Sequence, residues 1–138
     1  MKKLNNILFN FFAVIVHILG TVFLEAACAA KIVWHFDWDA GSNNIVILFA
    51  AVIIGVHALL MNINIRNIGM NWPVCLALTV FDLVVTAIVL WFCLMPNPIL
   101  YIYPKLVNFI DIILIQLVNA GVSALSFWGK KTGDGSLS

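Results

Sequence analysis

The chain has 138 residues, of which 64% are apolar and only 9% are charged, and its mean hydropathy is +1.10. A soluble domain carries about 25% charged residues, so this composition excludes a protein whose whole surface faces water. The net charge of +1 and the lack of a basic block argue against nucleic acid as a partner. The length fits one domain, residues 1–138, and its predicted surroundings are a lipid bilayer.

The first apolar segment has features of a secretory signal, because Lys2 and Lys3 precede it. However, the apolar core of a signal peptide has about 7–15 residues, and this run is longer. It also contains the ionisable residues His17 and Glu25. We therefore predict a retained membrane-spanning helix over residues 7–33.

Three further segments reach the roughly 20 mostly apolar residues that a membrane-crossing helix needs. They are predicted over residues 45–65, 72–95 and 99–128. Polar turns over 37–44 and 62–71 separate the first three helices, and Pro96 ends the third because proline cannot continue a helix. Residues 129–138 are predicted to form a mobile cytoplasmic tail. The expected fold is all-α, an integral membrane four-helix bundle with up-down topology.

The orientation of this bundle follows from the distribution of its basic residues. With four spans, both termini lie on the same side as the second loop. That side carries Lys2, Lys3, Arg66, Lys130 and Lys131. The other side has only Lys31 and Lys105. Both termini are therefore predicted to face the cytoplasm, and the Lys- and Asn-rich ends without an organellar targeting peptide favour a bacterial plasma membrane.

Ionisable side chains inside the predicted spans are the first candidates for function. Each costs roughly 2.5–3.5 kcal/mol on insertion scales, so each is expected to face other helices or water. The candidates for an ion or proton pathway are His17, Glu25, His57, Asp82 and Asp111. Polar side chains on the same helix faces could support them. These are Thr79, Thr86, Asn108, Gln116 and Asn119.

The depth of each candidate along its helix, at 1.5 Å per residue, sorts most of them into two layers. The first layer lies about 11–15 Å from the predicted cytoplasmic helix ends. It contains His17, His57, Asp82 and Asn119. The second lies at about 25–27 Å and contains Glu25 and Asp111. Individual pairings are not fixed by this argument, because the helix boundaries are uncertain by about 2–4 residues.

Three functions fit this pattern. The preferred one is passage of a proton, a small cation or a small polar solute through the bundle or through a homo-oligomer. The alternative is a non-catalytic accessory subunit of a larger membrane complex, in which polar groups serve to join helices. The third is a membrane anchor for quinone or haem, with His17 and His57 ligating haem iron from both sides. No motif predicts an enzyme or a metal site, and no resident cofactor is expected outside the haem hypothesis.

Overall fold

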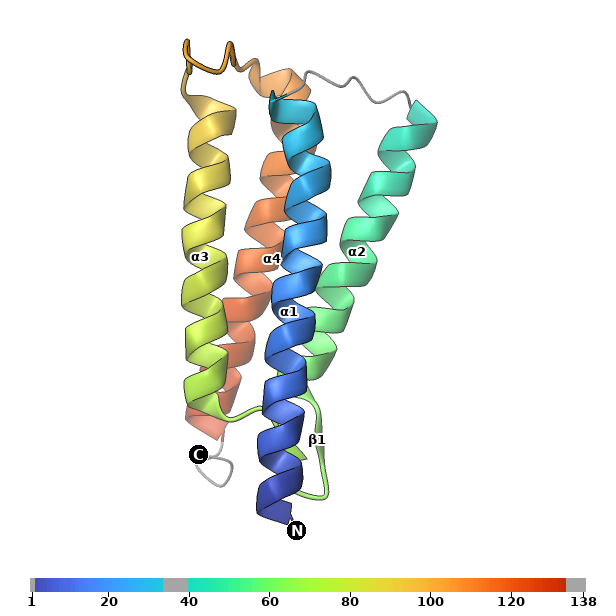
Figure 1. The fold of residues 1–138 in the computed structure, drawn as a ribbon, viewed down its shortest axis with the longest axis vertical. Coiled ribbons are helices and arrows are strands. Elements are labelled where there is room, and N and C mark those ends of the chain that lie inside the picture. Colours follow the sequence, from blue (N-terminus) through green and yellow to red (C-terminus); the bar gives the residue numbers. More distant parts are fainter. Residues whose placement is uncertain (1, 34–39, 134–138) are drawn as a thin grey trace.

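The computed structural model describes residues 2–33 and 40–133, except for the side chains at 33, 40–44, 106–108 and 133. The described residues form four helices that run alternately up and down (Figure 1). They are α1 (Lys2–Val33), α2 (Ala40–Asn62), α3 (Trp72–Leu94) and α4 (Leu106–Gly133). All four are long and apolar enough to cross a membrane. This confirms the predicted all-α four-helix fold. We call the end where α1 begins and α4 finishes the N-terminal end, and the opposite end the far end.

The predicted second span runs three residues too far, because α2 ends at Asn62 and a small hairpin follows. Its strands are β1 (Asn64–Ile65) and β2 (Ile68–Gly69), which pair antiparallel. Arg66 and Asn67 form the turn with φ values of 54° and 63°. Two consecutive residues with positive φ are typical of the tight turn whose twist matches a hairpin.

Two asparagines of α1 hold this hairpin against the bundle. The Asn6 side-chain oxygen accepts a hydrogen bond from the Gly69 amide at 2.9 Å. Asn10 accepts from the backbone N–H of Asn71 at 2.9 Å, and its own amide donates to the Gly69 carbonyl at 3.0 Å. Helix α1 therefore begins at Lys2, before the predicted start at residue 7. Polar side chains in its first turns bind the connection between α2 and α3.

The predicted start of the fourth span, at residue 99, is also wrong, since α4 begins at Leu106. Proline disfavours helical conformation in the residue before it, and Pro104 has this effect on Tyr103. The chain before α4 instead forms a bridge in which Asn97 and Ile102 exchange backbone hydrogen bonds of 2.8 and 2.9 Å. At its other end α4 continues to Gly133, so the expected tail is helical up to that residue, and residues 134–138 lie outside the described part.

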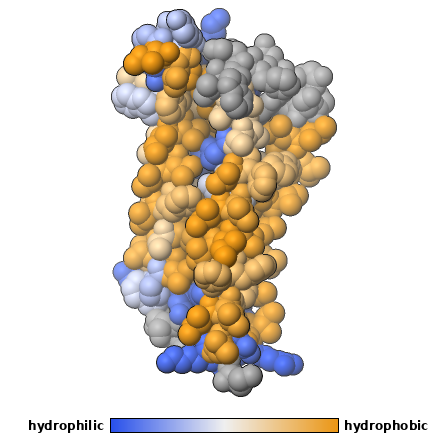
Figure 2. Space-filling view, viewed as in Figure 1, coloured by the Kyte–Doolittle hydropathy of each residue, from blue (hydrophilic) through white to orange (hydrophobic). Residues whose placement is uncertain are grey.

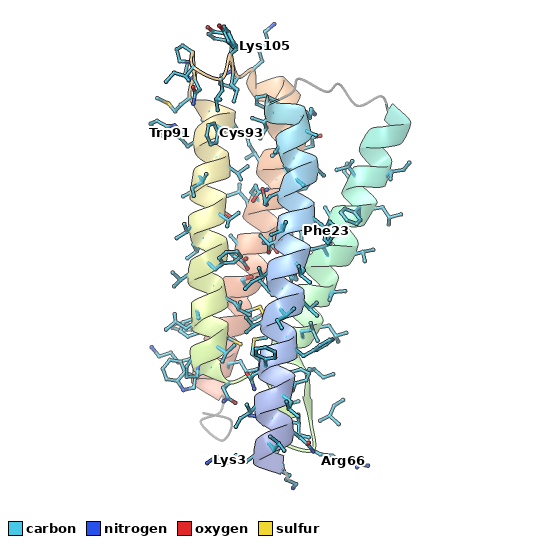
Figure 3. The ribbon with its side chains drawn as sticks, in the orientation of Figure 1. Lys3, Phe23, Arg66, Trp91, Cys93 and Lys105 are labelled. Atoms are coloured by element: carbon cyan, nitrogen blue, oxygen red, sulfur yellow. The ribbon has the colours of Figure 1, made fainter. Side chains whose placement is uncertain are left out.

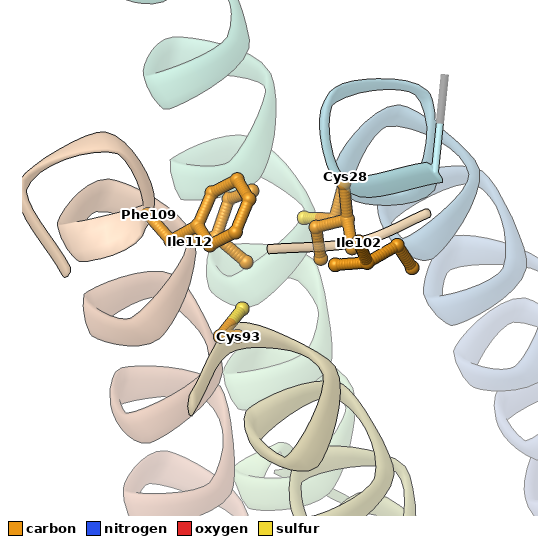
Figure 4. Close-up of a cluster of buried hydrophobic side chains, with 6 residues drawn as sticks. Cys28, Cys93, Ile102, Phe109 and Ile112 are labelled. Carbon is orange, nitrogen blue, oxygen red and sulfur yellow. The ribbon is translucent and has the colours of Figure 1, made fainter. Parts of the chain in front are cut away.

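Ile102 closes the far end of the bundle. Its side chain is completely buried and packs in an apolar cluster with residues of three helices (Figure 4). The other buried members are Cys28, Ile32, Cys93, Phe109 and Ile112. The loop before α4 thus contributes to the core instead of extending the helix.

On the face shown in Figure 2 the surface is mostly apolar along the helices, and most of its hydrophilic residues lie towards the two ends. Large apolar side chains such as Phe23 and Leu125 are 61% and 73% exposed. Lys3 and Arg66 lie at the N-terminal end and Lys105 at the far end (Figure 3). Exposure of this much apolar surface to water is unfavourable, whereas a bilayer would cover it. The fold is that of a small integral membrane protein.

Candidate functional site

A carboxylate on α3 forms the centre of the buried polar interior. The Nε2 atom of His17 lies 2.9 Å from both carboxylate oxygens of Asp82. The hydroxyl of Ser123 donates a further hydrogen bond to the same carboxylate. Asp82 and His17 are each only 1% exposed. A buried carboxylate needs such donors, because an unpaired charge in an apolar interior is costly.

A second imidazole extends this group to all four helices. The rings of His17 and His57 stack with centroids 3.9 Å apart and planes inclined by 21°. The Nδ1 atom of His57 lies 3.3 Å from the side-chain oxygen of Asn119. We call His17, His57, Asp82, Asn119 and Ser123 the central cluster. The predicted layer of two histidines, one aspartate and one asparagine is confirmed by these contacts. Their role in transport stays a prediction.

Ser123 is the member of the central cluster that was not among the predicted site residues. It lies four residues after Asn119 on α4, so both side chains project from one helix face. That spacing is the signal that could have found it. Its backbone carbonyl also accepts a hydrogen bond from the Thr79 hydroxyl at 3.0 Å, which joins α3 to α4 one turn from Asp82.

Two ring nitrogens of the central cluster have no hydrogen-bond partner among the described residues. They are Nδ1 of His17 and Nε2 of His57, and both are buried. Buried polar atoms in proteins are nearly always hydrogen-bonded, and each exception calls for an explanation. The two histidines therefore retain hydrogen-bonding capacity that the rest of the described chain does not use.

The two carboxylates of the second predicted layer, Glu25 and Asp111, each have a different partner. Glu25 accepts hydrogen bonds of 2.7 and 3.0 Å from the Gln116 amide. Lys31 and Asp111 form an ion pair with Nζ–oxygen distances of 3.1 and 3.2 Å. We call these the far pairs. Because each carboxylate has its own partner on the other helix, the far pairs both join α1 to α4.

The supporting residues mostly link α3 to α4. The Thr86 hydroxyl donates to the Gln116 carbonyl at 3.4 Å, in the same manner as Thr79 to Ser123. These contacts fit helix association through small hydroxyl side chains. Asn108 lies in the first turns of α4, where its side chain falls outside the described residues.

The stacked histidines bear on the haem hypothesis. Two imidazoles that ligate a haem iron direct one nitrogen each at the metal from opposite sides of the porphyrin. Here the rings of His17 and His57 lie face to face at 3.9 Å, which leaves no space between them for an iron and its porphyrin. Within residues 2–33 and 40–133, no group of three or more metal-binding side chains is present. The haem hypothesis stays a prediction that an absorption spectrum would test.

The chain matches no protein-family model, no curated protein and no solved structure. Inferences about function therefore rest on the residues and contacts of this chain alone.

Proposed function

We propose that this protein carries protons through the interior of its four-helix bundle, with the N-terminal end facing the cytoplasm of a bacterial cell. The observation that carries the proposal is the central cluster, where a buried carboxylate contacts one imidazole and a second imidazole stacks on the first. Ionisable side chains inside a membrane protein typically mark ion pathways or proton relays. An imidazole gains and loses its proton near neutral pH, and a carboxylate in hydrogen-bond contact with it can accept that proton or return it.

A proton fits this interior better than a larger cargo. A metal cation needs several oxygen ligands to replace its hydration shell, and the carboxylates here already accept hydrogen bonds from His17, Ser123 and Gln116. A proton needs only a series of hydrogen bonds that can exchange. The unpartnered nitrogens of the two histidines supply positions at which a proton can be gained or lost.

The proposed path passes three positions on α1, which are separated by two intervals. His17 and Glu25 are eight residues apart, about 12 Å along a helix, and Glu25 and Lys31 are separated by about 9 Å. Thr21 lies in the first interval and is buried, with its hydroxyl bonded to the His17 carbonyl. These intervals are too long for one hydrogen bond. In this proposal, water molecules enter between the layers and complete the connection during transport.

The proposal is tested with purified protein in liposomes that contain a pH-sensitive dye. Asp82→Asn keeps an oxygen that can accept a hydrogen bond from His17 but removes the titratable group, so proton flux should fall to the level of empty liposomes. Glu25→Gln should have the same effect. The matched control is Ser126→Ala, which removes the hydrogen bond from Asn62 that joins α2 to α4 without changing a titratable group. Wild-type flux in both carboxyl variants would exclude the proposal.

The second candidate function is an accessory subunit, and a groove between α2 and α4 favours it. The groove has a volume of about 270 Å³ and is lined mostly by small and apolar residues such as Ala50, Ala51 and Leu114, and also by Asp111. Helices associate closely where small residues line the interface, so a helix from another subunit or another copy could pack there. Copurification with a partner at fixed stoichiometry, without proton flux by the chain alone, would support this function over proton transport.

A further inference from the structure

A second groove lies between α1 and α2, beside the central cluster. Its volume is about 250 Å³, and Leu19, Val52, Val56, Gly20 and His57 are among the residues that line it. Leu19 and Val52 are 52% and 56% exposed on the apolar outer surface. The groove therefore opens towards the surrounding lipid and not towards either aqueous end.

Among the residues that line this groove, His57 has the polar side chain. His57 is 1% exposed, its Nδ1 atom faces Asn119, and one face of its ring is covered by His17. The remaining nitrogen, Nε2, makes no hydrogen bond of ordinary geometry within the described part of the chain. It lies next to Gly20, where a Cβ atom would come within 2.8 Å of it. A glycine at this position therefore leaves the space beside the nitrogen that a Cβ atom of α1 would otherwise occupy.

We propose that this groove binds the head group of a lipid-soluble quinone, with a ring carbonyl oxygen accepting a hydrogen bond from Nε2 of His57. A cavity of about 150 Å³ suffices for benzene, so the groove can hold a single quinone ring. Because Nε2 of His57 is buried, the quinone ring reaches it when α1 and α2 separate slightly at Gly20. Donation from Nε2 requires the tautomer of His57 in which Nε2 carries the proton and Nδ1 is an acceptor. The Asn119 amide must then turn its nitrogen towards the imidazole ring.

A neutral ligand suits this groove better than a fatty acid. The walls are almost entirely apolar, and an ionised carboxylate placed against such walls loses its hydration without gaining a cation. A quinone carbonyl needs only one donor, and the site offers one. The binding proposal does not rest on proton transport and would hold for a protein that moves no protons.

The direct test uses the wild-type protein in nanodiscs, with ¹⁵N-labelled histidine and a benzoquinone that carries a decyl tail. Addition of this probe should shift the Nε2 resonance of His57 and fix one tautomer, while the resonances of His17 move less. An unchanged His57 spectrum at saturating probe would overturn the proposal. Because no substitution is involved, this result does not depend on how well a variant folds.

Matched substitutions then locate the probe. Gly20→Ala should weaken binding by up to about tenfold, since loss of one hydrogen bond of ordinary strength corresponds to up to that factor. Gly55→Ala, where a Cβ atom would meet nothing within 4 Å, should bind as wild type. Val52→Phe should fill the groove from the lipid side, whereas Val80→Phe on the exposed face of α3 should have no effect.

Two outcomes of these titrations would contradict the proposal. Equal affinity in Val52→Phe and Val80→Phe would show that the probe binds elsewhere. Binding of decanoate with the same affinity and the same His57 shift would show that the site does not select a neutral carbonyl. A clear preference for the quinone over decanoate, lost in Val52→Phe, would support it.

Discussion

The central cluster and the far pairs are built from the same kinds of side chain, but the bundle holds them differently. The central cluster receives side chains from all four helices, and its carboxylate is almost completely buried. The far pairs join only α1 and α4, and the side chains of Lys31 and Asp111 are 16% and 15% exposed. The carboxylate of the central cluster is therefore expected to matter more for stability.

Helix α2 accounts for the difference. It contributes His57 to the central cluster, whereas beside Leu24 of α1 it supplies the apolar residues Ala50 and Ile53, which pack with Leu24 and Ile115. In Figure 1 α2 leans away from the other helices towards the far end. In this bundle, the polar layer to which all four helices contribute is more deeply buried than the ion pair between α1 and α4.

The largest effect is expected from Asp82→Ala. It removes the acceptor for His17 and Ser123 together, and breaking a buried pair by deleting one partner costs about 3–5 kcal/mol. Unfolding titrations in mixed micelles, followed by circular dichroism, measure the loss. Asp82→Asn is the control, because it keeps an oxygen for one of the two donors. If Asp82→Ala and Asp111→Ala lower the free energy of unfolding equally, the proposed difference between the two regions is wrong.

Gln116→Leu should be the next most destabilising change. It leaves the Glu25 carboxylate without its donor, and a hydrogen bond to a charged group contributes about 1.5–3 kcal/mol. The double variant Glu25→Leu with Gln116→Leu should recover much of this loss, because replacing both partners by apolar groups can be nearly neutral. The same unfolding titration applies to the three proteins. A double variant less stable than Gln116→Leu alone would argue against a simple paired contact.

Two glycine substitutions should have opposite signs. At position 20 the new Cβ atom would lie 2.8 Å from Nε2 of His57 and 3.3 Å from Cγ2 of Ile53, so Gly20→Ala should lower stability by about 1–3 kcal/mol. Gly55→Ala meets nothing within 4 Å and should raise it by about 0.5–1 kcal/mol through helix propensity. Thermal unfolding in one detergent compares them. Stabilisation by both changes would mean that α1 and α2 are not in close contact at Gly20.

The smallest effect is expected for Asp111→Asn. Its ion pair with Lys31 is partly exposed, and such pairs contribute about 0.2–1 kcal/mol. The effect should shrink as salt is raised from low ionic strength, because salt screens exposed charges. Unfolding titrations at two salt concentrations test this. A loss as large as that of Asp82→Ala, unaffected by salt, would place Asp111 in the same class as the central cluster.

Much of the site could be predicted from helical geometry. His17, His57, Asp82 and Asn119 lie at similar depths on alternating helices, and that property depends only on position along each span. Depth does not distinguish Glu25 from Asp111, because both lie at about 25–27 Å along their helices. Their partners Gln116 and Lys31 depend on the rotation of α1 against α4, which packing sets.

The sequence by itself determined that four apolar helices form, that they can cross a membrane, and that their few ionisable side chains turn inward. Hydropathy and the helical repeat are local properties, so a single chain reveals them. Only the tertiary structure decided that His17 contacts Asp82 and stacks on His57, that Ile102 closes the far end, and that α2 leans away from its neighbours. These features depend on the tilt and rotation of helices, which arise when side chains distant in sequence compete for the same space.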